Sequence, residues 1–268
     1  MSRIITLTTD FGLTDEYVGV MKGVILSLSP AARIIDLSHG IEPQNITQAA
    51  YLINSGSLYF PDNTLHIVVV DPGVGSKRRL ILVGARQQLF LAPDNGVLSL
   101  LLGDESFDFA YEIANTELFG KSVSKTFHGR DILAPVAAHL STGIPLEEVG
   151  PRLDHKELTQ LHLGATLAPD GKSVAGLVVQ IDRFGNLITN IDRQTAQQII
   201  GNNTEDTLTV KVGEQIIKNL ATCYDEVPTG SALALFGSRD YLEIAINQGN
   251  AAIFFDVAIG DTVHMQPG

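Results

Sequence analysis

The most constraining feature of this sequence is an almost unbroken apolar run at residues 65–70, in which His66 is the one polar residue. A strand with one face in water alternates apolar and polar residues, whereas a strand covered on both faces of a parallel sheet is apolar throughout. The run therefore predicts a central strand of a parallel sheet, and such a sheet requires helices on both faces.

The first 165 residues contain the other elements of such a fold. Thr14 is expected to cap a first helix that carries Val18, Met21 and Ile25 at helical spacing. Further strands are predicted at 4–9, 33–37, 80–83 and 89–91, and further helices at 45–55, 97–102 and 132–140. This alternation predicts an N-terminal α/β domain, residues 1–165, with a largely parallel sheet.

The pattern changes after Pro151, because short β-rich runs separated by turn residues replace the helical windows. Strands are predicted at 174–181, 207–212, 232–236, 242–246 and 262–265. A chain of 268 residues accommodates two domains. We therefore expect a smaller C-terminal β domain at residues 170–268, with a mostly antiparallel sheet for which a barrel is one option. The boundary between the two domains is expected near residues 155–172.

The composition restricts the partners. Eighteen basic and thirty acidic residues give a net charge of −12, which disfavours binding to nucleic acid because that affinity comes mainly from Lys and Arg on phosphates. The single cysteine, Cys223, allows no internal disulfide. No apolar run reaches the roughly eighteen residues of a membrane span, and the N-terminus lacks a signal-peptide pattern. We expect a soluble, cytoplasmic protein.

Three polar clusters follow predicted strands or precede a helix, where ligands bind in parallel α/β sheets. The first is TTDFG at residues 8–12. Its Asp10 has two interpretations with equal support: a carboxylate that accepts hydrogen bonds from vicinal hydroxyls such as those of a ribose, or a cap of the turn into the first helix.

The second cluster, VDPGVGSKRR at residues 70–79, directly follows the central apolar strand. Its glycines allow a tight loop whose backbone approaches a ligand closely, but the spacing fits neither a Walker motif nor G-x-G-x-x-G. One interpretation of Asp71 is a plain turn with an Asp–Arg surface pair. We favour a functional carboxylate, because Asp71 ends a central strand.

The third cluster, TFHGRD at residues 126–131, places His128 just before a predicted helix, where Arg130 and Asp131 are expected to pair with each other or cap the helix. A hydrolytic metal site of Asp10, Asp71 and His128 requires the fold to bring them together, and no metal-ligand motif supports it. No G-x-S-x-G nucleophile elbow is present either.

In the second half, one segment has a composition typical of a binding site, and a second is uninformative by itself. Residues 181–190, IDRFGNLITN, suit the binding of a polar small molecule, and a hairpin turn with Asp and Asn in turn positions explains them equally well. Residues 237–247, GSRDYLEIAIN, form a predicted loop that leads into a strand.

Taken together, the motifs resemble those of the S-adenosylmethionine (SAM) hydrolases, also called SAM hydroxide adenosyltransferases, which are related to the SAM-dependent fluorinase and chlorinase. TTDFG at 8–12, VDPGVG at 70–75, TFHGRD at 126–131, DRFGN at 182–186 and GSRDYLE at 237–243 occur in the family's order and span nearly the whole chain. The resemblance implies an N-terminal α/β domain, a C-terminal β domain, and a homotrimer whose active sites lie between subunits.

The resemblance also implies roles for individual residues. Asp71, Arg78 and His128 would position and polarise the attacking water, and Asp10 would hold the ribose hydroxyls. The substrate-binding residues of the second half would be Asp182 and Ser238 at the methionine part, Asn186 on the adenosine side, and Arg239, Tyr241 and Glu243 around the adenine.

The implied reaction is the hydrolysis of SAM to adenosine and methionine, with no metal or other cofactor. A sulfonium is already a good leaving group, so the site needs to align water behind C5′ for in-line attack. An Asp–His pair can take the proton, and Arg78 would keep Asp71 ionised; which group finally holds the proton stays open. The alternatives are a SAM-dependent halogenase, and a SAM- or adenosine-binding protein without catalytic function.

Overall fold

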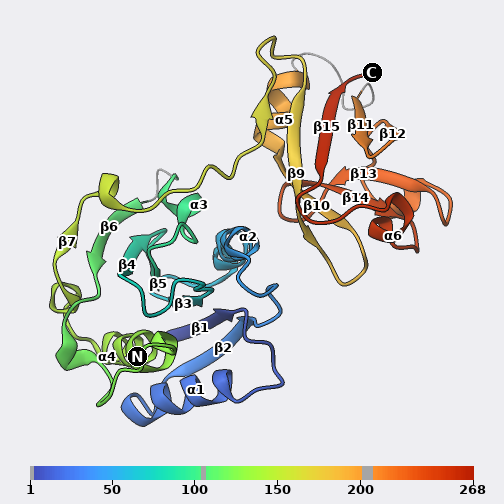
Figure 1. The fold of residues 1–268 in the computed structure, drawn as a ribbon. Coiled ribbons are helices and arrows are strands. Elements are labelled where there is room, and N and C mark those ends of the chain that lie inside the picture. Colours follow the sequence, from blue (N-terminus) through green and yellow to red (C-terminus); the bar gives the residue numbers. More distant parts are fainter. Residues whose placement is uncertain (1–2, 104–106, 201–207) are drawn as a thin grey trace. The chain divides into compact units, whose positions relative to one another are not determined.

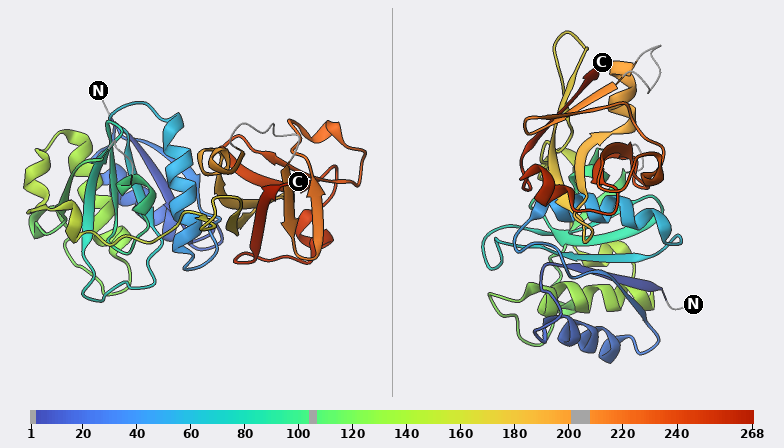
Figure 2. Two further views of the ribbon diagram at one scale, coloured as in Figure 1. Left: turned by 90° about the horizontal axis from the view of Figure 1, so that it is seen from above. Right: turned by 90° about the vertical axis from the view of Figure 1, so that its right-hand side faces the viewer.

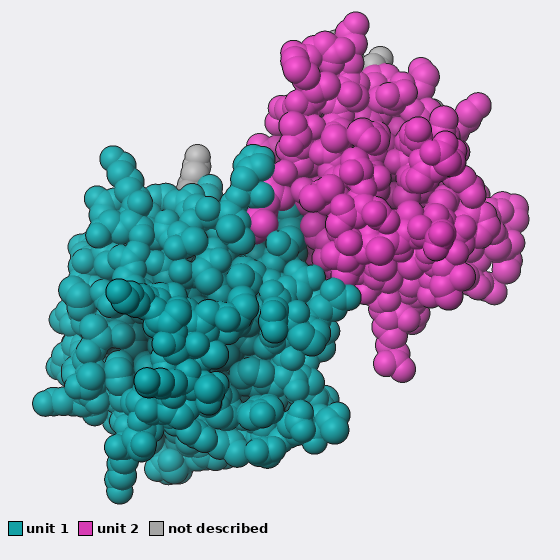
Figure 3. Space-filling view, in the orientation of Figure 1, with its two compact units in different colours: residues 1–162 teal, residues 163–268 magenta. Residues whose placement is uncertain are grey.

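The structure is a computed structural model that describes residues 3–103, 107–200 and 208–268. Figure 1 shows its elements, and Figure 2 shows the same ribbon from two further sides. The chain divides into two compact units, residues 1–162 and residues 163–268 (Figure 3). Each unit has its own sheet and its own hydrophobic core.

The first unit contains a seven-stranded mixed sheet in the order β2-β1-β3-β5-β4-β6-β7. Its strands are β1 (Ile4–Thr9), β2 (Arg33–Ser38), β3 (Leu65–Val69), β4 (Leu80–Ala85), β5 (Gln88–Pro93), β6 (Phe107–Glu112) and β7 (Arg152–Leu153). Strands β2, β1, β3 and β5 are parallel to one another, whereas β4 pairs antiparallel with β5 and β6, and β6 pairs antiparallel with β7.

The prediction of a largely parallel sheet is therefore correct for one half of the sheet and wrong for the other. The cause is a tight hairpin between β4 and β5, whose two turn residues, Arg86 and Gln87, both have positive φ values of 54° and 58°. That conformation matches the twist of a two-residue hairpin, but it normally selects Gly, Asn or Asp. The usual sequence signal of the hairpin is thus absent.

Helices cover both faces of this sheet, as Figure 2 shows. They are α1 (Tyr17–Leu28) and α4 (Ala134–Thr142) on one face, and α2 (Ile46–Gly56) and the short α3 (Ser99–Leu102) on the other. Helix α2 begins at Asn45, whose side chain accepts a hydrogen bond from the backbone N–H of Gln48 at 2.9 Å. The prediction that Thr14 caps the first helix is wrong: α1 starts at Tyr17 after a turn, without a side-chain cap.

Strand β3 confirms the prediction from the apolar run, because every one of its residues is buried between the parallel strands β1 and β5. Its single polar residue, His66, is also fully buried. The His66 ring stacks on Phe90, with centroids 4.8 Å apart, and its Nδ1 lies 2.7 Å from the Thr6 hydroxyl. A stacked, hydrogen-bonded imidazole thus takes the place of an apolar side chain.

The second unit contains an eight-stranded sheet in which every pair is antiparallel. The order is β12-β11-β15-β9-β10-β14-β13, with β8 beside β9, and the outer strands β12 and β13 contact each other, which brings the sheet close to a barrel. The strands are β8 (Thr166–Leu167), β9 (Val174–Ile181), β10 (Leu187–Asp192), β11 (Leu208–Val212), β12 (Gln215–Lys218), β13 (Ala232–Phe236), β14 (Tyr241–Ile246) and β15 (Thr262–Pro267).

Four predicted strands of this unit agree with β9, β13, β14 and β15, and the fifth agrees with β11 except for Thr207, which lies outside the described residues. The central strand β10 was not predicted, because the buried Thr189 and Asn190 interrupt its apolar pattern. Asn190 is accommodated by hydrogen bonds to the backbone of Leu177 and Leu163. Helices α5 (Arg193–Ile200) and α6 (Ala251–Phe255) were also missed.

Within the described ranges, no helix combines the length and the apolar character that crossing a membrane requires.

Candidate functional site

The parallel register of the first sheet brings two of the predicted carboxylates to one edge. Thr9 of β1 lies opposite Val69 of β3, so Asp10 and Asp71 follow neighbouring strands at their carboxyl ends. This is the edge at which ligands bind in parallel α/β sheets. The fold therefore creates the edge on which the predicted cluster depends.

Asp71 and Arg78 form the two ends of the loop that follows β3. The loop turns through hydrogen bonds from the N–H of Val74 to the Asp71 carbonyl and from the N–H of Ser76 to the Gly73 carbonyl. Gly75 has a φ of +77°, a conformation that favours glycine. These turns fold the chain back so that Arg78 returns to Asp71.

The Arg78 guanidinium binds both carboxylate oxygens of Asp71. Its Nε lies 2.7 Å from Oδ1 and 2.8 Å from Oδ2, and its Nη2 also donates to Oδ2. Only 6% of the Asp71 side chain and 9% of the Arg78 side chain are exposed. The two residues are therefore not the surface pair of the alternative interpretation but a largely buried, bidentate ion pair.

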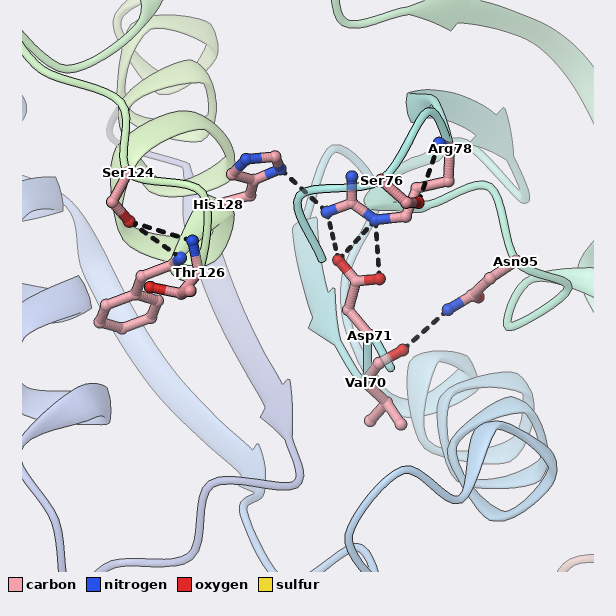
Figure 4. Close-up of polar contacts among 9 residues, drawn as sticks. Val70, Asp71, Ser76, Arg78, Asn95, Ser124, Thr126 and His128 are labelled. Carbon is pink, nitrogen blue, oxygen red and sulfur yellow. Dashed lines mark hydrogen bonds and ion pairs between the residues drawn. The ribbon is translucent and has the colours of Figure 1, made fainter. Parts of the chain in front are cut away.

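His128 completes the cluster from another part of the chain. It directly precedes a π-helical turn, Gly129–Leu133, and its Nδ1 lies 2.9 Å from Arg78 Nη2. Because a guanidinium only donates, Nδ1 is the acceptor, and the imidazole carries its proton on Nε2. Figure 4 shows Arg78 between Asp71 and His128.

The surroundings of His128 favour its neutral form. Burial lowers the pKa of the imidazole, and the positive charge of Arg78 lowers it further, against smaller opposite effects of Asp71 and Asp131. The segment is held in place by the Ser124 hydroxyl, which accepts hydrogen bonds from the N–H groups of Thr126 and Phe127 (Figure 4). His128 is thus a fixed, neutral hydrogen-bond partner of Arg78.

Arg130 and Asp131 pair with each other, as the sequence predicted. Arg130 Nε lies 2.6 Å from Asp131 Oδ1, and Asp131 Oδ2 accepts a hydrogen bond from the N–H of Ser124 at 2.8 Å. Asp131 thereby ties the loop before His128 to the π-helical turn after it. Its role in this geometry is structural.

Asp10 lies on the same edge but has a separate hydrogen bond. Its Oδ2 accepts from the backbone N–H of Gln44 at 2.8 Å, and Gln44 has a positive φ of 68°. Asp10 therefore bridges to the loop before α2 and does not cap the turn into α1. In the described ranges, no hydrogen bond or ion pair joins Asp10 to Asp71, Arg78 or His128.

The second unit contains a pocket of about 560 Å³ whose lining includes all six substrate-binding residues predicted for this half of the chain. They are Asp182, Asn186, Ser238, Arg239, Tyr241 and Glu243, from the turn between β9 and β10, the turn between β13 and β14, and the first residues of β14. The structure therefore brings together two motifs that lie some fifty residues apart in the sequence.

The β9–β10 turn confirms the hairpin interpretation of residues 181–190. Asp182 Oδ1 accepts hydrogen bonds from the N–H groups of Phe184 and Asn186, at 2.8 and 2.9 Å. Its Oδ2 accepts from Asn186 Nδ2 at 3.1 Å. The same residues line the pocket, so the turn and a binding surface are both present in this segment.

The pocket also contains a contact that the sequence did not predict. Tyr224 donates its hydroxyl to Glu243 Oε1 at 2.5 Å. Burial raises the pKa of Glu243 despite this hydrogen bond, and the nearby Asp182 raises it further. Tyr224 belongs to a segment without strand or motif pattern, so no signal in the sequence marked it. Arg239 is oriented by a hydrogen bond from its Nη1 to Gln180 Oε1 at 2.9 Å.

No group of three or more His, Cys, Asp and Glu side chains is placed to hold a metal ion in the part of the chain that the structure describes. The sequence alternative required Asp10, Asp71 and His128 as ligands. Both Asp71 oxygens and His128 Nδ1 instead contact Arg78, a cation in the place where a metal would have to lie.

The two units also correspond to two known domains. Residues 5–150 match the family model for the SAM hydroxide adenosyltransferase N-terminal domain, and residues 176–264 match the model for the C-terminal domain of the same family. The chain belongs to the SAM hydroxide adenosyltransferase family.

Individual relatives cover nearly the whole chain. A protein of Thermus thermophilus named (R)-S-adenosyl-L-methionine hydrolase is 36% identical over 93% of this chain and 94% of its own length. A Nocardia brasiliensis protein named fluorinase is 28% identical over 99% of this chain and 97% of its own length. The crystal structure of an uncharacterized conserved protein from Thermotoga maritima, 40% identical, superimposes with a TM-score of 0.89 over 98% of this chain and 99% of that chain.

Proposed function

We propose that this protein is a hydrolase that converts SAM and water to adenosine and methionine. The observation that carries the proposal is the partly buried Asp71–Arg78–His128 cluster at the carboxyl edge of the first sheet. It occurs in a chain whose 33–36% identical relatives are named (R)-S-adenosyl-L-methionine hydrolase.

Within the cluster, Asp71 is the residue that acts on the water. Arg78 can only donate, and His128 Nδ1 is occupied by Arg78 while its Nε2 carries a proton. Asp71 keeps lone pairs beyond those that face Arg78, because a carboxylate accepts about four hydrogen bonds. We therefore assign to Asp71 the orientation of the water and the acceptance of its proton.

Arg78 and His128 act through their contacts with Asp71. The bidentate guanidinium fixes the carboxylate plane, and the neutral imidazole holds the free side of the guanidinium. Asp71 and His128 do not form the direct Asp–His pair that the sequence suggested, since Arg78 lies between them (Figure 4). Because sulfonium leaves readily, in-line positioning of water behind C5′ supplies much of the rate.

The substrate is bound by Asp10 and by the pocket of the second unit. Asp10 accepts hydrogen bonds from the ribose hydroxyls through the oxygen that Gln44 leaves free. Asp182 and Ser238 bind the methionine part, and Asn186 binds on the adenosine side. Arg239, Tyr241 and Glu243 line the adenine region. The carboxylates among these residues suit a substrate that carries a sulfonium and an ammonium group.

We further propose that the protein is a cytoplasmic homotrimer in which two subunits contribute to each active site. The support is the family resemblance, since motifs of both halves are required for one site. Light scattering should give three times the mass of the chain. A monomer with full activity would contradict the proposal.

A second candidate is a halogenase, which the fluorinase relatives at 28–29% identity favour. Chromatography of SAM incubated with the protein, with and without chloride or fluoride, separates the two functions. We expect adenosine in every buffer, whereas a halogenated adenosine would identify a halogenase. A third possibility, a binding protein, predicts less than one turnover per site with adenosine retained.

The catalytic assignment is tested by Asp71→Asn, which preserves shape and removes the charge. We expect kcat to fall by at least about 100-fold with a much smaller change in SAM affinity measured by calorimetry. Adding His128→Ala should cost little more, because members of one unit are not additive. The matched control is Asp94→Asn, which weakens another Asp–Arg ion pair, with Arg79 at 2.8 Å, and should lower stability but not kcat. Wild-type turnover of Asp71→Asn would refute the assignment.

A further inference from the structure

His39 links the surface of the first unit to the end of β1. It follows β2, and only 2% of its side chain is exposed. Its Nδ1 lies 2.8 Å from the Thr9 hydroxyl, and its Nε2 lies 3.1 Å from Asp36 Oδ1. Asp36 also accepts a hydrogen bond from Lys22 at 2.6 Å. A continuous series of polar contacts thus runs from Lys22 to Thr9.

The donors and acceptors of this series have one consistent direction. The Thr9 hydroxyl oxygen accepts a hydrogen bond from the N–H of Phe11 at 3.2 Å, so its own proton is available for His39 Nδ1. Nε2 then carries the proton and lies 3.1 Å from Asp36 Oδ1, a polar contact that does not complete a hydrogen bond. Burial raises the pKa of Asp36, but the contacts with Lys22 and His39 outweigh it and lower the pKa, which keeps the carboxylate ionised.

The backbone of His39 makes a second contact with the same loop. Its carbonyl accepts a hydrogen bond from the N–H of Gly12 at 2.9 Å. His39 therefore holds the loop on both sides of Asp10, at Thr9 through the ring and at Gly12 through the main chain. Asp10 Oδ2 is fixed in turn by the N–H of Gln44. Three contacts therefore hold Asp10 and its flanking residues: one at Thr9, one at Gly12 and one at the Asp10 carboxylate itself.

We propose that Thr9 and His39 are positioning residues that hold Asp10 in the orientation in which its carboxylate binds the substrate ribose. The inference rests on the proposed function, because it assigns these residues a role through Asp10. Neither side chain touches the substrate in this scheme. Thr9 is fully buried and His39 is nearly so.

The test compares conservative substitutions at two neighbouring positions of β1. Thr9→Val keeps the shape and removes the hydroxyl, Thr9→Ser keeps the hydroxyl, and Thr8→Val removes a buried hydroxyl that has no partner among the described residues. We expect Thr9→Val to raise KM for SAM about tenfold, with a smaller effect on kcat, as the loss of one ordering hydrogen bond implies. Thr9→Ser should restore KM, and Thr8→Val should leave both constants unchanged.

Coupling to Asp10 distinguishes positioning from mere stabilisation. In an Asp10→Ala background, Thr9→Val should not raise KM further, because the group that it orients is gone. A structural role alone would lower Tm and leave KM unchanged in both backgrounds. Equal increases of KM in the presence and absence of the Asp10 carboxylate would overturn the proposal.

Amide hydrogen exchange tests the loop without any substrate. Thr9→Val should speed exchange at Phe11 and Gly12 while β1 remains protected, and Thr8→Val should not. Unchanged exchange at both amides would refute the positioning role whatever the enzyme's substrate. Failure of the wild-type protein to form adenosine would instead refute the proposed function, and the exchange result would still decide whether Thr9 and His39 hold this loop.

Discussion

Gly75, in the loop that carries Arg78, closely approaches Lys125 in the loop that carries His128, so Gly75→Ala should disrupt the proposed catalytic cluster. A Cβ built on Gly75 would overlap the carbonyl oxygen of Lys125 and would lie 3.2 Å from its carbonyl carbon. Normal contacts between carbon and a carbonyl oxygen are 3.3–3.6 Å, so the loops must move apart by about 1 Å. Gly75 and Lys125 each lie three residues from the side chain that they position.

The magnitude follows from this displacement. A movement of about 1 Å breaks the 2.9 Å contact between Arg78 and His128, and misplacement on that scale costs roughly 100-fold in rate. Alanine in the left-handed conformation costs a further 1 kcal/mol or so of stability. We expect kcat for adenosine release to fall about 100-fold and the unfolding free energy to fall by about 2 kcal/mol.

Gly171→Ala is the matched control, because Gly171 has a similar φ of +67° and a Cβ there meets no atom within 4 Å. This variant should lose about 1 kcal/mol of stability and retain kcat. Steady-state adenosine release and urea unfolding of both variants decide the matter. A Gly75→Ala enzyme with kcat within threefold of the wild type would show that the cluster does not depend on the approach of these loops.

Three further predictions concern pH, charge and metal. Burial lowers the pKa of His66 from 6.5 to about 4, so between these pH values the unfolded chain binds a proton that the native protein does not. The free energy of unfolding should therefore fall by about 3 kcal/mol from pH 6.5 to pH 4. Urea unfolding of His66→Gln should show a weaker dependence of stability on pH. Asp182→Asn, at the methionine part of the proposed site, should weaken the binding of SAM about tenfold in calorimetry but hardly affect the binding of neutral adenosine, and equal losses would argue against a charge effect. EDTA should leave the hydrolysis rate unchanged, and loss of activity restored by a divalent ion would revive the metal hypothesis.

The sequence predicts those elements whose burial follows from periodicity. Strand β3 is the strongest case, because a fully apolar run has few alternatives to a central parallel strand. The antiparallel half of the sheet could not be predicted, since Arg86 and Gln87 adopt positive φ values without the usual hairpin residues. Strand β10 could not be predicted either, because Asn190 interrupts its apolar pattern and is buried through hydrogen bonds that only the folded sheet provides.

The candidate site likewise has one part that the sequence predicts and another that it does not. Chain order and strand ends predict that Asp10 and Asp71 share an edge, and the β1–β3 register agrees. No local pattern predicts that Arg78 lies between Asp71 and His128, because this depends on the approach of two loops fifty residues apart. Tyr224 likewise reaches Glu243 across a separation of nineteen residues. Pairings of this kind are tertiary, and only the resemblance to a family suggested any of them beforehand.

The arrangement of charge offers a physical reason why the product would leave the proposed site more readily than the substrate. The charges of the Asp71 cluster are balanced within it, because Arg78 compensates the Asp71 carboxylate and His128 is neutral. The pocket of the second unit instead contains two acidic side chains, Asp182 and Glu243, beside Arg239. Burial raises the pKa of Glu243, and the charge of Asp182 raises it further. A bound sulfonium would relieve that repulsion, and hydrolysis removes the sulfonium charge. The neutral adenosine then lacks the attraction that retained the substrate, so the same electrostatics that bind SAM favour release of the product.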